Sequence, residues 1–238
     1  MTPGQTLSLP EPVAHHLQVL RLRIGERITL FNGEGGEFLA RLTSIERRQA
    51  KVCIEEHLPR EAELPYAITL AQALPEGNKM DWIVEKAVEL GATVIQPLQA
   101  QRCVVKLAAD RAARKLAHWQ AIAVAACEQS GRNRIPTIAE PAGLAAWLAS
   151  ALPAAASLGA ARLLLSPRAD ISLPSWAGGQ APQPVALLIG PEGGFSPDEE
   201  QAALAHGATL VSMGARILRT ETAGVAAMAA LNAIWHPG

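Results

Sequence analysis

The sequence predicts an α/β protein in two parts, a small β-barrel or sandwich domain followed by a larger domain built on a parallel β-sheet. Two observations lead to this fold class. Up to about residue 60, short segments alternate apolar and polar residues, as strands with one buried face do. From Tyr66 onward, short apolar runs alternate with helical patterns, as expected for strands that helices cover on both faces. We expect the domains to span residues 1–64 and 65–238.

Length and composition favour a folded chain without a membrane span. The chain has 238 residues, of which 49% are hydrophobic and 18% charged, which is enough to bury a sizeable core. Proline or charge interrupts the apolar stretches well before the roughly 20 residues that a membrane span needs. The N-terminus shows neither a signal nor a transit peptide pattern. The three cysteines form no CxxC pair and have no histidine at metal-ligand spacing. We therefore expect a cytoplasmic protein without a metal or a disulfide.

Turn signals set the expected elements of the first domain. A short helical pattern at Val13, Leu17 and Leu20 precedes three alternating runs. Glycine-containing pairs separate the first two runs, as in hairpins. The expected strands are Arg27–Phe31, Glu37–Ile45 and Ala50–His57. The charged segment Pro59–Pro65, bracketed by prolines, is expected to link the domains.

The second domain begins with a predicted βαβ unit. Its strands are Ile68–Leu74 and Val94–Leu98, and the residues from Met80 to Leu90 have helical spacing, with Gly91 placed to end the helix. Residues 174–184 contain three prolines and two glycines and are expected to form a loop. The other expected elements are a long helix near Leu107–Cys127, an alanine-rich helix at Leu144–Leu152, strands at Arg162–Leu165, Val185–Ile189 and Thr209–Ser212, and a last helix from about Thr222 to Trp235.

The sharpest motif is the sequence IGPEGGFSPDEE at residues 189–200. A buried strand leads into a glycine-rich turn, and Ser196 with Glu199 then forms a capping box that begins a helix. Three glycines allow positive φ angles and let a ligand approach the backbone, as a nucleotide-like cofactor at a strand end requires. Neither GxGxxG nor GxxxxGK[ST] is present, which weakens the case for NAD or ATP.

A second motif, SMGARILRTETA at residues 212–223, also follows a strand. Its loop is apolar enough to hold an adenine ring. Thr220 and Thr222 are candidate N-caps of the last helix. Arg219 and Glu221 either face a second, polar substrate or form a surface ion pair.

The positive charge of a chain with net charge −1 is concentrated in one stretch. Residues 101–134 hold seven basic and two acidic side chains, a distribution that suits a phosphate contact. For the part between Lys106 and Lys115, a solvated helix face is the more typical explanation. The stretch ends in CEQSGRNRIP, where Gln129 and Arg132 can bind a base edge or a phosphate, although Gly131 followed by basic residues is also an ordinary helix end.

Taken together, these motifs resemble one family. The segments GPEGGFSPDE, MGARILRTETA, KMDWIVEKAVELG and EQSGRNRIP are similar to those of bacterial 16S ribosomal RNA (uracil-N3)-methyltransferases of the SPOUT superfamily. The segment HHLQVLRLRIGERITLFNGEGGEFLARL resembles the PUA-like RNA-binding barrel of that family. The resemblance implies a SPOUT-type parallel sheet with a C-terminal trefoil knot, S-adenosyl-L-methionine bound in the knot, and a homodimer. It also implies methylation of N3 of a uridine in 16S rRNA or in the assembled small ribosomal subunit.

The resemblance further implies roles for particular residues. Either Glu221 or Glu192 would act as the base. The residues expected to hold the uridine are Gln129, Arg132, Arg219 and Glu221. RNA contacts are expected at Arg21, Arg23 and Arg102. For Arg21 and Arg23 the reason is their place on either side of Leu22, just after the first helical pattern: in an extended segment both side chains would lie on the same face, away from the core. The residues expected to line the cofactor pocket are Leu165, Ile189, Gly190, Pro191, Glu192, Gly193, Met213, Gly214, Ile217, Leu218 and Ala223.

Two other classes of function stay open at this stage. A different nucleotide-dependent α/β enzyme would bind NAD or ATP, and a non-catalytic RNA-binding module would bind RNA without turnover. The absence of GxGxxG disfavours the first class, and Arg219 and Glu221 beside a complete cofactor loop disfavour the second. The last helix is apolar nearly all round, which predicts that a second subunit covers the side carrying Ala229 or Ala230.

Overall fold

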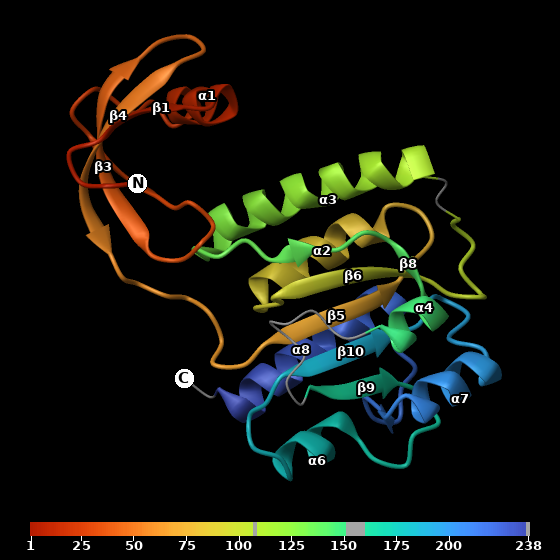
Figure 1. The fold of residues 1–238 in the computed structure, drawn as a ribbon. Helices are drawn as coiled ribbons and strands as arrows, with labels where there is room; N and C mark the ends of the chain where they lie inside the picture. Colours follow the sequence, from red (N-terminus) through yellow and green to blue (C-terminus); the bar gives the residue numbers. More distant parts are fainter. Residues whose placement is uncertain (107–108, 151–159, 237–238) are drawn as a thin grey trace. The chain divides into compact units, whose positions relative to one another are not determined.

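The computed structural model describes residues 1–106, 109–150 and 160–236. The chain divides into two compact units, Met1–Ala62 with Gly131–Ile135, and Glu63–Ser130 with Pro136–Gly238. The smaller unit contains an antiparallel sheet and the larger one a parallel sheet (Figure 1). The predicted fold class is therefore confirmed. Within the described ranges, no helix is both long and apolar enough to cross a membrane.

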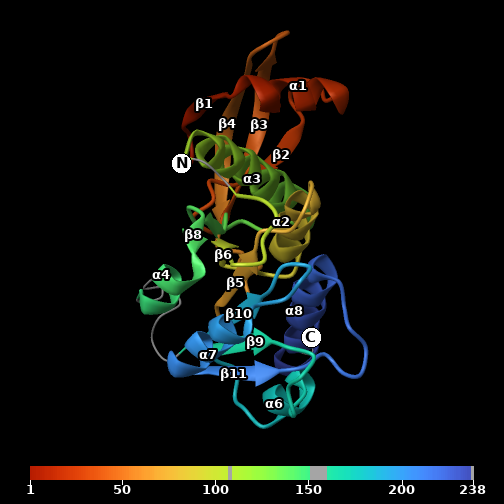
Figure 2. The same ribbon diagram turned by 90° about the vertical axis from the view of Figure 1, so that its right-hand side faces the viewer.

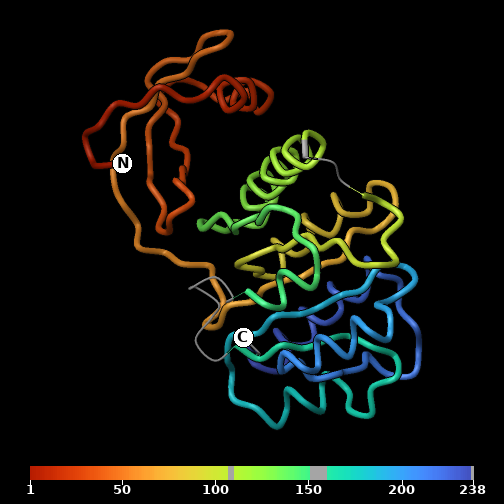
Figure 3. Tube along the Cα trace, turned by 45° about the vertical axis from the view of Figure 1, so that its right-hand side comes forward, coloured from red at the N-terminus to blue at the C-terminus, as the bar shows by residue number. Residues whose placement is uncertain are grey.

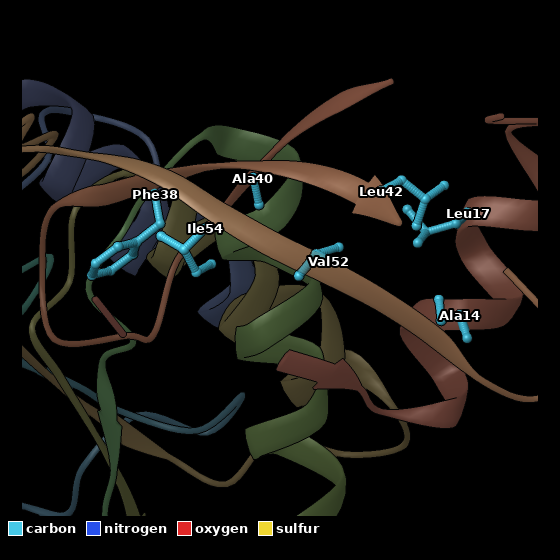
Figure 4. Packing of buried hydrophobic residues seen from close by; sticks show 8 residues of the cluster. Ala14, Leu17, Phe38, Ala40, Leu42, Val52 and Ile54 are labelled. Carbon is cyan, nitrogen blue, oxygen red and sulfur yellow. The ribbon is translucent and has the colours of Figure 1, made fainter. Parts of the chain in front are cut away.

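The small unit is a four-stranded sheet, in the order β1-β4-β3-β2, with one helix packed against it. Its elements are β1 (Thr6–Leu9), α1 (Glu11–Val19), β2 (Arg27–Leu30), β3 (Glu37–Ile45) and β4 (Ala50–Leu58). Alternate residues of β3 and β4 point inward and form one hydrophobic cluster with α1, in which Phe38 lies beside Ile54 and Leu42 lies beside Leu17 (Figure 4). Strand β1, which pairs with β4, was not predicted, because four residues are too few to establish an alternation.

The segment Gly131–Ile135 completes the small unit, although the sequence analysis assigned it to the larger domain. The backbone N–H of Gly35 donates to the Asn133 carbonyl at 3.1 Å, and the N–H of Ile135 donates to the Gly33 carbonyl at 3.1 Å. The Arg134 guanidinium contacts the Glu61 carboxylate at 2.9 and 3.0 Å. Figure 3 shows this green segment beside the turn between β2 and β3, which contains Gly33 and Gly35. A pairing between residues so far apart in the chain leaves no local pattern in the sequence.

The large unit is built on one sheet in the order β11-β9-β10-β5-β6-β7, with β8 also beside β6. All of these pairings are parallel. Strands β5 and β10 are buried at every position, as predicted for strands of a parallel sheet. The sequence of β10 is apolar throughout, whereas β5 also buries Thr69 and Gln72. The strands are β5 (Ile68–Ala73), β6 (Val94–Gln99), β7 (Thr137–Ile138), β8 (Ala142–Gly143), β9 (Ala161–Leu165), β10 (Val185–Ile189) and β11 (Ala208–Val211).

Helices cover both faces of the sheet. Figure 2 shows α2 and α8 on one side and α4 and α7 on the other. The helices are α2 (Lys79–Glu89), α3 (Ala109–Ser130), α4 (Leu144–Ala149), α6 (Leu173–Gly178), α7 (Pro197–Ala205) and α8 (Thr220–Trp235). Helix α2 ends at Gly91 with φ +88°, and Ser196 and Glu199 form the predicted capping box of α7. The end of the predicted alanine-rich helix, at residues 151–152, lies outside the described residues.

Helix α6 corrects the first part of the loop predicted at residues 174–184, since residues 174–178 are helical and only 179–184 contain no helix or strand. Ser172 caps its N-terminus by accepting a hydrogen bond from the Ser175 N–H, and Pro174 lies in the first turn, where it is tolerated. Leu173 and Ala177 are fully buried, and the Trp235 indole N–H donates to the Ala177 carbonyl at 2.9 Å. Proline therefore begins a short helix here, and docking against α8 stabilises it.

The order of the last strands forces the chain to cross the end of the sheet. Strand β11 lies on the side of β9 that faces away from β10, yet α8, which follows β11, begins beside the end of β10. The segment that leaves β9 is itself bonded to the end of β11, since the Ser166 N–H donates to the Val211 carbonyl at 3.0 Å. A crossing of this kind is what the expected knot requires. It also brings the loops after three strands to one edge of the sheet.

Candidate functional site

A cavity of about 490 Å³ lies at the carboxyl ends of β9, β10 and β11. In a parallel sheet this edge is the usual place for a ligand, because the loops that follow the strands meet there. The volume is within the range of small-molecule sites, roughly 300–1,000 Å³. The walls come from the segments Leu165–Arg168, Ile189–Phe195 and Met213–Glu221, together with Lys79, Arg102, Glu200 and Ala223.

The first wall is the glycine loop, which we define as residues 190–196. A Cβ atom on Gly190 would lie 3.0 Å from the Phe195 nitrogen and 3.1 Å from the Gly194 Cα, so glycine is required where the loop closes on itself. Of the three loop glycines, only Gly194 has a positive φ, +66°. The sequence motif predicted that all three glycines could have positive φ, and this holds only for Gly194. The tight closure leaves the backbone of the loop facing the cavity.

Glu192 is held by groups from another part of the chain. Its Oε1 accepts hydrogen bonds from Lys79 Nζ at 2.6 Å and from the Glu76 backbone N–H at 3.1 Å. Burial acts to raise the pKa of the Glu192 carboxyl, but these hydrogen bonds outweigh it and the pKa is lowered. Because the folded pKa is below the unfolded one, this stabilisation is present at neutral pH and is lost as the pH falls through the lowered pKa. Glu192 therefore anchors the loop as a carboxylate.

Arg102 braces the same loop from outside. Its guanidinium donates to the Gly193 carbonyl at 2.8 Å and to the Phe195 carbonyl at 3.3 Å. The sequence analysis predicted Arg102 as an RNA contact. Among the described residues its partners are carbonyl oxygens and no carboxylate, so its positive charge adds to the positive potential at the cavity while it shapes the loop.

The second wall is the loop from Met213 to Arg219. Gly214 has φ +95°, a conformation that side chains rarely adopt. Arg216 and Arg219 are exposed, and their side chains form no hydrogen bond or ion pair with the described residues. Ile217 borders the cavity but is 84% exposed, so in this chain alone it covers little of the interior. The uncommitted arginines are available to an anionic ligand.

The start of α8 closes the cavity. Arg219 is at the N-cap position and provides no side-chain cap, and the Thr220 hydroxyl donates to the Gly190 carbonyl instead of capping the helix. The expected capping role of Thr220 is therefore wrong. Glu221 faces the cavity, and its Oε2 is buried with no hydrogen-bond partner among the described residues. A buried carboxylate oxygen without a donor is costly, which marks Glu221 as a candidate functional residue of this cavity.

The cavity brings together most of the site residues that the sequence predicted. All eleven predicted cofactor residues line it, as do Arg219, Glu221 and Arg102. Gln129 and Arg132 do not line it: Gln129 lies in the last turn of α3, and Arg132 is 5% exposed within the Gly131–Ile135 segment. Sequence reasoning missed Lys79, Arg168 and Glu200. Arg168 contacts Glu200 at 2.6 Å, and only the sheet order brings such distant residues together.

Comparison with known proteins finds matches for both parts of the chain. The model of the RNA methyltransferase domain matches residues 62–232, and that of the RNA methyltransferase PUA domain matches residues 9–55. The ribosomal RNA small subunit methyltransferase E of Synechocystis is 36% identical over 96% of this chain and 73% of its own length. That of Bacillus subtilis is 33% identical over 93% of this chain and 87% of its own length.

Two solved structures also match this chain over nearly its whole length. The crystal structure of a ribosomal RNA small subunit methyltransferase E from Neisseria gonorrhoeae, bound to S-adenosyl methionine, matches with a TM-score of 0.89 and 40% identity over 99% of this chain and 94% of that one. A Legionella pneumophila protein in complex with bound SAM matches with a TM-score of 0.86 and 38% identity over 98% and 93% of the two chains. The chain therefore belongs to the ribosomal RNA small subunit methyltransferase E family.

Proposed function

We propose that this chain transfers the methyl group of S-adenosylmethionine to N3 of a uridine in small-subunit ribosomal RNA. The observation that carries the proposal is the single cavity in which the glycine loop, the Met213–Arg219 loop and the start of α8 converge at three strand ends. Relatives that share 40% and 38% of their sequence with this chain hold S-adenosylmethionine. We further propose that the protein acts in the cytoplasm, as a homodimer, on 16S rRNA or the assembled small subunit.

The residues of the cavity fit this cofactor. Gly190, Gly193 and Gly214 leave backbone groups open to an adenine ring and a ribose, and Leu165, Ile189 and Leu218 supply apolar walls. S-adenosylmethionine supplies a methyl group attached to a positively charged sulfur. No phosphate-binding GxGxxG or GxxxxGK[ST] loop is present in the sequence, so nicotinamide and ATP cofactors fit less well.

The chain's own groups have distinct tasks in the proposed reaction. The N3–H of uracil is a weak acid on the Watson–Crick edge of the base, so the base must be unpaired before N3 can react. Arg219, whose side chain has no partner among the described residues, is suited to hold the uridine, and Arg216 to hold a neighbouring phosphate. The Glu221 carboxylate, which borders the cavity, is suited to accept the N3 proton. Most of the rate enhancement then comes from positioning.

Glu221 is a better proton acceptor than Glu192, because Glu192 already accepts hydrogen bonds from Lys79 and a backbone N–H. We expect Glu221→Gln to lower kcat by about 10²–10⁴-fold, the usual contribution of a general base, with little change in cofactor affinity. Glu192→Gln should instead raise the KM for S-adenosylmethionine, because it loosens the glycine loop. Steady-state kinetics of both variants make the comparison. A larger loss of kcat in Glu192→Gln would reverse the assignment.

The experiment that tests the proposed function is a calorimetric titration of the purified protein with S-adenosylmethionine, NAD and ATP in parallel, followed by a methyl-transfer assay on small ribosomal subunits. The proposal expects binding of S-adenosylmethionine alone and transfer of its methyl group to the rRNA. Binding of NAD or ATP would support a different nucleotide-dependent enzyme. Binding of RNA with no transfer of the methyl group would support a non-catalytic RNA-binding module.

The small unit offers two arginines to RNA. Arg21 and Arg23 are exposed and follow α1, where the sequence analysis expected an extended segment. Arg21 instead has φ +56°, and the Leu22 N–H donates to the Leu17 carbonyl at 3.1 Å, which is a helix-ending turn that usually contains glycine. Holding a residue other than glycine in this conformation costs about 1–2 kcal/mol. The arginine side chain is thus kept at a conformational cost, as expected of a binding residue.

We expect the double variant Arg21→Ala, Arg23→Ala to weaken rRNA binding. If each arginine neutralises one phosphate, the slope of log affinity against log salt should fall by about 1.5 to 2 units. Binding measured at several salt concentrations gives the slope. Arg111→Ala with Arg114→Ala, on the exposed face of α3, is a matched control that removes the same charge. An equal loss in both double variants would show that only net charge matters.

A further inference from the structure

A buried chain of hydrogen bonds connects β5, α8 and the glycine loop. Gln72 of β5 is fully buried, and its Nε2 donates to Thr220 Oγ1 and to the Ala73 carbonyl, each at 2.9 Å. Thr220 Oγ1 in turn donates to the Gly190 carbonyl at 2.6 Å. A hydroxyl has a single hydrogen to donate, so the direction of this chain is fixed. The Thr220 side chain thereby connects the first residue of the glycine loop, Gly190, to the first turn of α8.

The chain of hydrogen bonds also determines where the neighbours of Thr220 lie. Thr220 is only 6% exposed because it turns away from solvent toward Gln72. The residues on either side, Arg219 and Glu221, both border the cavity. The position of the Thr220 hydroxyl therefore sets the distance between the glycine loop, which would hold the cofactor, and Glu221, which would face the base.

Close packing prevents α8 from shifting to compensate for the loss of this contact. A Cβ atom on Gly224 would lie 3.1 Å from Leu70 Cδ1 and 3.6 Å from Gln72 Oε1, so the helix already rests directly on β5. Without the Thr220 hydroxyl, the Gly190 carbonyl and the Gln72 amide would each lose a partner that the closely packed surroundings do not replace. The loss would therefore act on the glycine loop at Gly190, which this hydrogen bond helps to hold in place.

We propose that Thr220 and Gln72 are positioning residues, which hold Gly190 and Glu221 at the separation that cofactor binding and methyl transfer require. This inference rests on the proposed function. Neither residue needs to touch the reacting atoms, since both act through the glycine loop and the start of α8. The effect should therefore appear in cofactor affinity and in kcat together.

The test replaces the hydroxyl while keeping the shape. Thr220→Val should raise the Kd for S-adenosylmethionine by about tenfold or more and lower kcat, because both hydrogen bonds are lost. Thr220→Ser keeps the hydroxyl and should stay within about threefold of the unchanged protein. Gln72→Met removes the donor to Thr220, together with the hydrogen bond to the Ala73 carbonyl, but keeps the bond from Thr220 to Gly190. Its Kd and kcat should therefore lie between those of the other two variants. Calorimetry gives the Kd, steady-state kinetics give kcat and KM, and thermal unfolding gives the melting temperature of each variant.

Thr69→Val is the matched control. Thr69 is also fully buried, lies on β5, and its hydroxyl has no hydrogen-bond partner among the described residues. Removing an unpartnered buried hydroxyl should leave the Kd and kcat unchanged. The control separates the loss of this hydrogen-bonded chain from the general effect of changing a buried threonine to valine in the same unit.

Each outcome decides between alternatives. If Thr220→Val lowers the melting temperature but leaves the Kd and kcat unchanged, the contact is only structural and the proposal is overturned. Equal impairment of the valine and serine variants would also overturn it, since the hydroxyl would then not matter. If Thr220→Val does not fold, Gln72→Met and Thr220→Ser still test the proposal. Failure of the unchanged protein to bind S-adenosylmethionine would instead count against the proposed function.

Discussion

The variant Gly190→Val is expected to lose measurable binding of S-adenosylmethionine. A side chain at this position would collide with the backbone of the glycine loop itself, 3.0 Å away at the Phe195 nitrogen, and backbone cannot rotate aside as a side chain can. The loop must open, which displaces Glu192 from Lys79 and moves the wall of the cavity. Calorimetric titration with S-adenosylmethionine measures the loss, and circular dichroism shows whether the fold is kept.

Two further glycine variants distinguish an effect on the loops of the cavity from the general effect of replacing a glycine by valine. Gly214→Val meets no atom within 4 Å, but its φ of +95° disfavours any side chain, so the Met213–Arg219 loop should change conformation and cofactor binding should again be lost. Gly143→Val is the control, since Gly143 has φ −66°, meets nothing within 4 Å and lies outside the cavity. Affinities of Gly190→Val and Gly214→Val equal to that of the control would show that the cofactor binds elsewhere.

The variant Ala229→Glu is expected to be monomeric and to transfer little methyl. Helix α8 buries Ala227, Met228 and Leu231 against its own unit, while Ala229 is exposed and Ala230 is partly buried. The structure thus favours Ala229 over Ala230 as the position that faces a second subunit. If the subunit covers it, an unpaired buried carboxylate would cost about 3–5 kcal/mol. Sedimentation measures the mass, and an assay on small subunits measures the activity.

Ala113→Glu, on an exposed position of α3, is the control for the added charge. It should leave both the oligomeric state and the activity unchanged. Sedimentation of the unchanged protein as a fully active monomer at micromolar concentration would refute the homodimer and its link to catalysis.

The elements of the large unit could be predicted because their signals are local. A continuous apolar run identifies β10, and a mostly apolar run identifies β5, as strands buried on both faces. The capping box at Ser196 marks the start of α7. Residues 174–178 were misjudged because proline and glycine signal a break, whereas here Pro174 lies in the first turn of α6. The burial of Leu173 and Ala177 stabilises this helix, and no local sequence pattern predicts that burial.

The sequence predicts the two loops that line the site, but it does not predict the side chains that hold those loops in place. The motifs at residues 189–200 and 212–223 indicated which residues would line the cavity. The anchoring of Glu192 by Lys79 and the bracing of Gly193 by Arg102 join residues about a hundred positions apart, and only the sheet order brings them together. The same holds for Thr220, which the local pattern marks as a helix cap and which the structure bonds to Gly190.

The measurement that tests the central claim most directly is mass spectrometry of nucleosides from small-subunit rRNA, prepared from a deletion strain and from the same strain carrying this gene. The account predicts that 3-methyluridine is absent after deletion and returns with the unchanged gene, but not with one encoding Gly190→Val. Unchanged 3-methyluridine in the deletion strain, or the return of a different methylated nucleoside on complementation, would contradict it.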